Sequence, residues 1–188
     1  LDELDAPREK LPFASAQVFD PCAARGNAAE EKAVRSLAEK AGTALSELPK
    51  KNLCCGYGGH MRLANPELYG EIVENRVSEG EKPYIVYCAN CLEVFRTRGK
   101  QCAHVLDAVF GTENAGVPTL DEKRANALKV KETLMQTLEN AKFTPEKQPW
   151  AELELVIAPE VRAHMEEHLI SAADLGETIY LAEADRGY

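Results

Sequence analysis

Five of the six cysteines in this 188-residue chain follow a spacing that suits metal or redox chemistry. Cys22 is separated by 31 residues from the adjacent pair Cys54 and Cys55, 32 residues separate Cys55 from Cys88, and two residues separate Cys88 from Cys91. Adjacent cysteines rarely bond to each other, because closing so small a ring strains both the peptide and the disulfide. In a chain long enough to bury a core, close cysteine pairs favour a metal or redox site over a secreted disulfide framework.

The adjacent cysteines open a glycine-rich segment, CCGYGGH, in which Gly56, Gly58 and Gly59 precede His60. A backbone without Cβ approaches a bound metal group closely and turns its N–H groups toward the sulfurs. These three glycines are therefore candidate cofactor-binding residues. His60 is the candidate catalytic residue, because an imidazole that titrates near neutral pH would donate a hydrogen bond or a proton beside such a group. The alternative is a loop histidine without a special role.

Short apolar strands alternate with amphipathic helices around these cysteines. The clearest strand, YIVY at 84–87, is β-branched and aromatic and ends directly at Cys88. Asn65 as N-cap and Pro66 in the first turn predict the start of a helix. Such alternation favours a parallel α/β sheet flanked by helices, with its functional loops beyond the carboxyl ends of the strands. We therefore expect all the paired cysteines at that edge. Further strands are expected at 16–19 and 43–49, further helices at 28–41 and 92–97, and a last strand and helix within 102–111.

The rest of the chain has a different pattern. Residues 121–142 predict a long charged helix, WAELELVI at 150–157 alternates like a strand, and two helices are expected to begin at Pro159 and after Ser171. The sequence therefore predicts three segments: a cysteine-rich domain at 14–111, a linker with a charged helix at 112–149, and a small α+β module at 150–188.

Charge is distributed unevenly along the chain. Residues 1–111 hold 16 acidic and 14 basic residues, whereas residues 112–188 hold 15 acidic and 8 basic, and the net charge is -9. This balance argues against a general nucleic-acid binder, which needs clustered Lys and Arg. A basic rim that attracts an anionic disulfide or partner is one interpretation of the cations near the cysteines, and merely solvated side chains are the other. These cations are Arg62, Arg76, Arg96, Arg98 and Lys100.

No apolar run approaches the roughly 20 residues needed to span a bilayer. The first residues, LDELDAPREK, are charged rather than signal-like. We therefore expect a cytoplasmic protein in a reducing compartment. Because the sequence starts without Met and stops without a helix-ending pattern, we also expect it to be part of a longer polypeptide.

Several segments together resemble the cysteine-rich CCG domain. That domain occurs in heterodisulfide reductase catalytic subunits of the B/D type and in iron-sulfur subunits of glycolate and glycerol-3-phosphate oxidoreductases. The resemblance covers about residues 14–111 and extends beyond the thiols. It rests on VFDPC, CCGYGG, the helix NPEL…ENR and IVYCANC.

The resemblance implies a non-cubane [4Fe-4S] cluster bound by Cys22, Cys54, Cys55, Cys88 and Cys91, with one thiolate able to bridge two irons. It also implies an oxidoreductase domain that transfers electrons to a disulfide or related acceptor. The residues themselves are compatible with this, since iron-sulfur clusters take thiolate ligands and five gathered thiolates would repel one another without a cationic centre.

Other interpretations of the cysteines remain open. Four of them would suffice for a structural zinc ion, in which case the chain is a zinc-stabilised docking module of a larger redox complex. A set of buried free cysteines is a further alternative. Cys102 lies outside the pattern and is interpreted as a buried strand residue.

The electron supply is expected to lie outside this sequence. Cleaving a disulfide takes two electrons, whereas the chain carries one cysteine motif and lacks the C-x2-C-x2-C-x3-C pattern of a ferredoxin-like cluster. The segment LISAADLGETIYLAEAD resembles the end of fused proteins of the pyridine nucleotide-disulfide oxidoreductase type. This implies flavin and ferredoxin-like modules or subunits as partners, with NAD(P)H and FAD as the electron source.

One further pattern lies in the tail. His164, Glu167 and His168 match the H-x-x-E-H spacing of some metalloproteases. The sequence shows no third metal ligand to accompany this motif, so a solvated helix face is the preferred interpretation of these residues.

Overall fold

The computed structural model describes residues 9–58, 60–111, 116–139 and 148–185. It divides the chain into two compact units, Leu1–Val117 and Pro118–Tyr188, called unit 1 and unit 2 below. The three segment boundaries expected from the sequence stay predictions.

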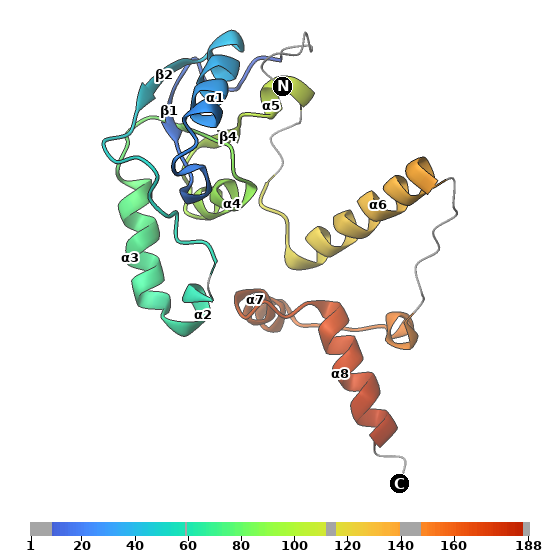
Figure 1. Ribbon diagram of the computed structural model, residues 1–188. Coiled ribbons are helices and arrows are strands. Elements are labelled where there is room, and N and C mark those ends of the chain that lie inside the picture. The colour runs from blue at the N-terminus through green and yellow to red at the C-terminus, as the bar shows by residue number, and fades with distance from the viewer. Residues whose placement is uncertain (1–8, 59, 112–115, 140–147, 186–188) are drawn as a thin grey trace. The chain divides into compact units, whose positions relative to one another are not determined.

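Unit 1 is built on a four-stranded sheet in which every pair of neighbouring strands is parallel. The strand order is β2-β1-β3-β4, so the chain first moves outward from β1 and then crosses back over it (Figure 1). In register, Phe19 of β1 lies opposite Val86 of β3. The strands are β1 (Ser15–Phe19), β2 (Ala44–Glu47), β3 (Tyr84–Val86) and β4 (Cys102–His104).

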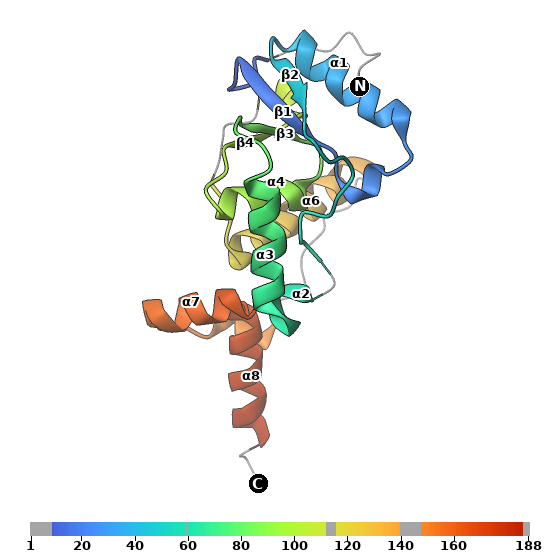
Figure 2. The ribbon, with the colours of Figure 1, turned by 90° about the vertical axis from the view of Figure 1, so that its left-hand side faces the viewer.

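Helices cover both faces of this sheet, with α1 on one side and α3 and α4 on the other (Figure 2). Two hydrophobic clusters correspond to these faces. One contains Val34 and Leu37 of α1, and the other contains Val73 of α3 and Phe95 of α4. The expected fold class, a parallel sheet flanked by helices and followed by a long helix, is confirmed. The helices of unit 1 are α1 (Ala28–Lys40), α2 (Met61–Ala64), α3 (Pro66–Val77), α4 (Ala89–Thr97) and α5 (Asp107–Phe110), with a 3₁₀ turn, η1 (Cys22–Ala24).

The helix starts follow from local sequence. The Asn27 side chain accepts a hydrogen bond from the Glu30 backbone N–H at the start of α1. The Asn65 side chain accepts one from the Leu68 N–H, and Pro66 occupies the first turn of α3, as expected. The helix α4 begins at residue 89, three residues earlier than predicted. The reason is that the extended backbone of Cys88 acts as the N-cap, so the helix follows the strand almost directly.

An aromatic group forms the core beneath α4. The Phe95 ring packs edge-on against Phe19 and Tyr84, with centroids 4.7 and 5.4 Å apart. All three side chains are fully buried. The Tyr84 hydroxyl donates to the Arg76 carbonyl oxygen at 2.9 Å, which satisfies its polar end. The core therefore lies directly under the strand ends that carry the cysteines.

The described residues of unit 2 form three helices and one 3₁₀ turn. Glu166 of α7 accepts hydrogen bonds from the Leu120 N–H at the start of α6. Ser171 caps α8, as predicted, by accepting from the Asp174 N–H at 3.2 Å. The elements of unit 2 are α6 (Leu120–Glu139), the 3₁₀ turn η2 (Pro149–Glu152), α7 (Pro159–Glu167) and α8 (Ala172–Asp185).

The prediction of a strand at 150–157 is wrong. Residues 149–152 form the turn η2, and the described chain from 153 to 158 has no regular secondary structure. The described part of unit 2 contains no other strand that could pair with it. An alternating pattern alone does not make a strand, because the backbone N–H and C=O groups of a strand need a neighbour. Among the described residues, no helix is both long and apolar enough to cross a membrane.

Candidate metal centre

The sheet topology brings two cysteine segments together. Cys22 follows β1 and Cys88 follows β3, and these strands are neighbours whose carboxyl ends meet at one edge. The connections from β1 and β3 lead to opposite faces of the sheet, to α1 and α4 respectively. Ligand sites in open parallel sheets occur in the crevice at such a point.

The loop that follows β2 contributes the adjacent cysteines. Gly56 and Gly58 both have positive φ, +98° and +95°, a conformation that glycine adopts without steric cost. The Gly56 N–H donates to the Cys54 sulfur at 3.4 Å, and the Tyr57 N–H donates to the Cys55 sulfur. The loop therefore directs backbone donors at both thiols, and the role of the glycines in binding a cofactor stays a prediction. Gly59 lies outside the described residues.

The five thiols form a connected group. The Cys91 thiol donates to the Cys55 sulfur across 3.2 Å, and Cys91 also lies beside Cys88. Cys22 lies within hydrogen-bonding reach of Cys54 and near enough to Cys55 and Cys88 for their charges to act on it. The structure thus brings together the sulfurs that the sequence pattern singled out.

Their pKa values respond to this crowding. The hydrogen bond from Cys91 lowers the pKa of Cys55 to about 7, despite burial. The same contact raises the pKa of Cys91, and desolvation and the neighbouring Cys55 and Cys88 charges raise it further. Desolvation, with Cys54 next, raises the pKa of Cys22. The raised pKa values favour protonated thiols at Cys22 and Cys91, and a positive centre between the sulfurs would favour their thiolate forms instead.

The thiols range from buried to exposed. Cys55 and Cys91 are buried within the cluster that contains Phe95, Cys88 is half-buried, and Cys22 and Cys54 are exposed. Cys91 lies in the first turn of α4, near the positive end of that helix. A group held here is anchored to the core on one side and accessible to solvent on the other.

The number and spacing of the sulfurs indicate which kind of metal group the site could hold. A tetrahedral zinc ion holds sulfur ligands at about 2.3 Å, which places them within about 4 Å of one another. Among the described residues, the cysteine sulfurs do not form a group close enough to hold a metal ion in their present positions. Five thiols are also one more than a tetrahedral ion binds, and they fit a group of several metal atoms in which different sulfurs bind different metals. An iron-sulfur cluster is such a group.

A buried carboxylate that the sequence analysis did not single out ties two of the cysteine segments together. Asp20 is 3% exposed and accepts two hydrogen bonds from the Arg35 guanidinium of α1, at 2.8 and 3.0 Å. It also accepts one from the Tyr87 hydroxyl at 2.8 Å. Asp20 stands two residues before Cys22, and Tyr87 stands one residue before Cys88. The contact therefore fixes both cysteine segments relative to α1.

The other predicted site residues have varied surroundings. His60 is exposed and lies at the start of α2 with φ of 58°, and its ring makes no hydrogen bond to a cysteine among the described residues. Its catalytic role stays a prediction. Cys102 is buried in β4, as expected, where its thiol lies 3.7 Å from the Leu92 carbonyl oxygen.

Three of the five cations considered for a basic rim make contacts inside unit 1. Arg76 pairs with Glu79 at 2.5 Å, and Arg96 donates to the Cys102 carbonyl oxygen. The Lys100 ammonium lies 4.1 Å from the centre of the Tyr84 ring. These cations stabilise the structure, which leaves less charge than expected for attracting an anionic partner.

Comparison with known proteins supports the domain assignment. Residues 16–96 match the family model CCG, described as a cysteine-rich domain, which is found in iron-sulfur redox proteins. The matched range contains all five motif cysteines and ends before Cys102 and unit 2. Searches among curated proteins and among solved structures returned no match. Residues 16–96 of unit 1 are therefore similar to the CCG cysteine-rich domain, in agreement with the motifs.

Proposed function

We propose that unit 1 is an iron-sulfur oxidoreductase domain of the heterodisulfide reductase type, which transfers electrons to a disulfide or a related acceptor. In this proposal a non-cubane [4Fe-4S] cluster is held by the five motif cysteines: Cys22, Cys54, Cys55, Cys88 and Cys91. When bound, the cluster supplies a centre that accepts and releases single electrons.

The convergence of the five thiols at the carboxyl edge of the sheet carries this proposal. Two further observations support it. The five thiols are one more than a tetrahedral zinc ion binds. The exposed side of the group, at Cys22 and Cys54, leaves room for an acceptor to approach.

The chain's own residues would hold and tune this group. Asp20, through Arg35 and Tyr87, fixes the segments that carry Cys22 and Cys88. The N–H groups of Gly56 and Tyr57 stabilise negative charge on the sulfurs that they contact. The buried side of the site excludes water, which strengthens these contacts.

Reduction of a disulfide consumes two electrons and two protons and yields two thiols. One cluster of this kind passes electrons singly, so a donor has to deliver two electrons for each disulfide cleaved. We propose flavin and ferredoxin-like modules or subunits as that source, with NAD(P)H as the primary donor. In an assay of the isolated chain, reduced methyl viologen replaces these modules as the electron donor.

Cluster assembly tests the ligand set directly. After anaerobic reconstitution of the full chain, Cys55→Ser should lose most of the bound iron and acid-labile sulfide, because its thiol lies at the buried centre of the group. Cys102→Ser is the matched control, since Cys102 is equally buried and outside the motif. The control should retain the iron content of the unmodified chain. Equal iron in both variants contradicts the ligand assignment.

Electron transfer is tested on the same preparations. The reconstituted chain should catalyse oxidation of reduced methyl viologen by a small disulfide, with two viologens oxidised for each disulfide cleaved. Cys55→Ser should show only the uncatalysed rate, and Cys102→Ser the full rate. A cluster that assembles fully but does not transfer electrons to any disulfide leaves the cluster assignment standing and overturns the proposed acceptor.

A further inference from the structure

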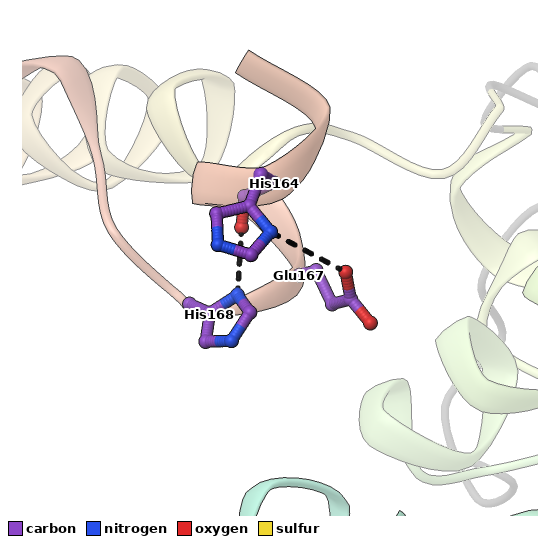
Figure 3. Close-up of side chains that lie close together, drawn as sticks. All are labelled: His164, Glu167 and His168. Carbon is purple, nitrogen blue, oxygen red and sulfur yellow. Dashed lines mark hydrogen bonds and ion pairs between the residues drawn. The ribbon is translucent and has the colours of Figure 1, made fainter. Parts of the chain in front are cut away.

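Three side chains on α7 converge on one exposed face of unit 2. His164, Glu167 and His168 each place one potential ligand atom within 4.8 Å of the other two (Figure 3). Residues three and four positions apart lie on the same side of a helix, so the H-x-x-E-H spacing produces this arrangement directly. The three side chains are exposed, as the sequence predicted, and they bring two imidazole nitrogens and one carboxylate close together.

The proton position on one ring follows from its contact. Nδ1 of His168 lies 2.9 Å from the carbonyl oxygen of His164. A carbonyl oxygen only accepts, so Nδ1 of His168 carries the proton, which leaves Nε2 to bind a metal. Figure 3 shows Nε2 on the side of the ring away from His164, so the His168 side chain has to turn before Nε2 faces the other two residues. Metal-binding histidines commonly donate the second ring N–H to a carbonyl oxygen, which fixes the tautomer and the ring orientation.

The second ring and the carboxylate lie beside the first. The centroids of the His164 and His168 rings are 4.2 Å apart. Nδ1 of His164 lies 3.9 Å from a carboxylate oxygen of Glu167. A carboxylate next to two imidazoles places negative charge where a cation would bind, and together they form the nitrogen and oxygen donor set that divalent transition metals take.

The end of α7 is fixed where these residues lie. Leu169 has φ of 58°, and the Ile170 N–H donates to the Met165 carbonyl oxygen at 2.8 Å, which closes the helix in a Schellman motif. Met165 is buried and holds the opposite side of the same turn. The backbone that carries the three side chains is therefore ordered before any ion binds, which lowers the entropic cost of binding.

We propose that His164, Glu167 and His168 bind a zinc ion, independently of the cysteine site. Zinc takes nitrogen and oxygen ligands at about 2.0–2.2 Å, so the side chains have to close inward from their present spacing. The side chains of His164 and Glu167 are 70% and 73% exposed and have room for this movement. Three protein ligands leave a fourth position for water or for a side chain of another molecule.

Histidine ring signals provide a test that the cysteines do not obscure. The chain has four histidines, and the long-range ¹H–¹⁵N spectrum of the full chain, assigned by His→Gln variants, resolves each ring. Zinc chloride is added beyond the amount that the cysteines take up. The ring nitrogens of His164 and His168 should shift together and reach saturation, while those of His60 stay unchanged.

Variants of α7 separate binding from charge. Loss of a ligand in Glu167→Gln should weaken the zinc affinity reported by the His164 ring by about tenfold or more. Glu160→Gln removes the same charge from the first turn of the same helix and should leave that affinity unchanged. Far-UV circular dichroism confirms that both variants keep their helices. The proposal is overturned if the two rings do not respond to zinc, or if His168→Gln leaves the His164 response as it was.

Discussion

Different kinds of contact stabilise unit 1 and unit 2. Among the described residues, nearly all buried apolar side chains lie in unit 1, and Met165 is the exception in unit 2. Unit 2 instead relies on polar contacts, such as Arg124 with Asp174, and exposes large apolar side chains such as Val156 and Val161. A sheet with helices on both faces holds the loops between them in place through packing. Helices that contact one another mainly through hydrogen bonds order little beyond their own residues. This difference explains why the five-thiol group lies in unit 1 and why the ligand cluster of unit 2 comes from a single helix.

The largest expected effect concerns the buried carboxylate in unit 1. Arg35→Met leaves Asp20 without its charge partner and should reduce the free energy of unfolding by about 3–5 kcal/mol. Urea denaturation followed by circular dichroism measures this change. Lys32→Met removes the same charge from an exposed position on α1 and should change the stability little. Equal stabilities for the two variants would show that Asp20 does not depend on Arg35.

A smaller effect is expected in the glycine loop. A Cβ on Gly56 would lie 2.9 Å from Cγ2 of Val73, and φ there is +98°. Gly56→Ala should therefore cost about 1–3 kcal/mol and lower the iron content after reconstitution. Gly42→Ala is the control, because Gly42 has φ of +86° but open space around its Cα. The cost at Gly56 should exceed that at Gly42, and the reverse order contradicts the close packing of the loop against α3.

The polar contacts of unit 2 predict a weaker effect. Ser171→Ala removes the N-cap of α8 and should destabilise that helix by about 0.5–2 kcal/mol. Amide hydrogen exchange in the first turns of α8 reports the change without interference from unit 1. Thr178→Ala removes a hydroxyl that only bonds back to the Asp174 carbonyl oxygen and should leave exchange nearly unchanged. Similar exchange in both variants would show that the cap does not stabilise α8.

The same cap predicts a dependence on pH. Hydrogen bonds from the Arg124 guanidinium and from Ser171 lower the pKa of Asp174 from 3.8 to about 2. A depressed folded-state pKa adds stability that is fully present above the unfolded value and is lost as the pH falls through the folded value. The protection of α8 amides in the unmodified chain, relative to Asp174→Asn, should therefore be constant above pH 4 and decline toward pH 2. A difference that does not change over this range contradicts the contact.

The sequence predicted the parts of the fold that depend on local pattern. The strand at 84–87, the N-cap at Asn65 and the position of the cysteines beyond the strand ends all follow from periodicity, capping and the geometry of parallel sheets. The contacts of Asp20 could not be predicted in this way, because they join residues 15 and 67 positions apart. The strand expected at 150–157 failed for the same reason, since its alternation says nothing about a pairing partner.

The candidate site divides in the same way. The five cysteines and the glycine turns could be singled out by type and spacing, whereas their burial and mutual contacts depend on the packing of α3 and α4. Arg76 and Arg96 looked available for a partner, and only the fold shows that they bond within unit 1.

The central claim is that five thiols share one group of several metal atoms. X-ray absorption at the iron edge, on the anaerobically reconstituted full chain, tests it most directly. We expect sulfur atoms as the nearest neighbours of each iron and further iron atoms at a longer distance. Iron with no metal neighbour would contradict it, as would a zinc-edge spectrum of the same sample that shows stoichiometric zinc with four sulfurs at about 2.3 Å and no second metal.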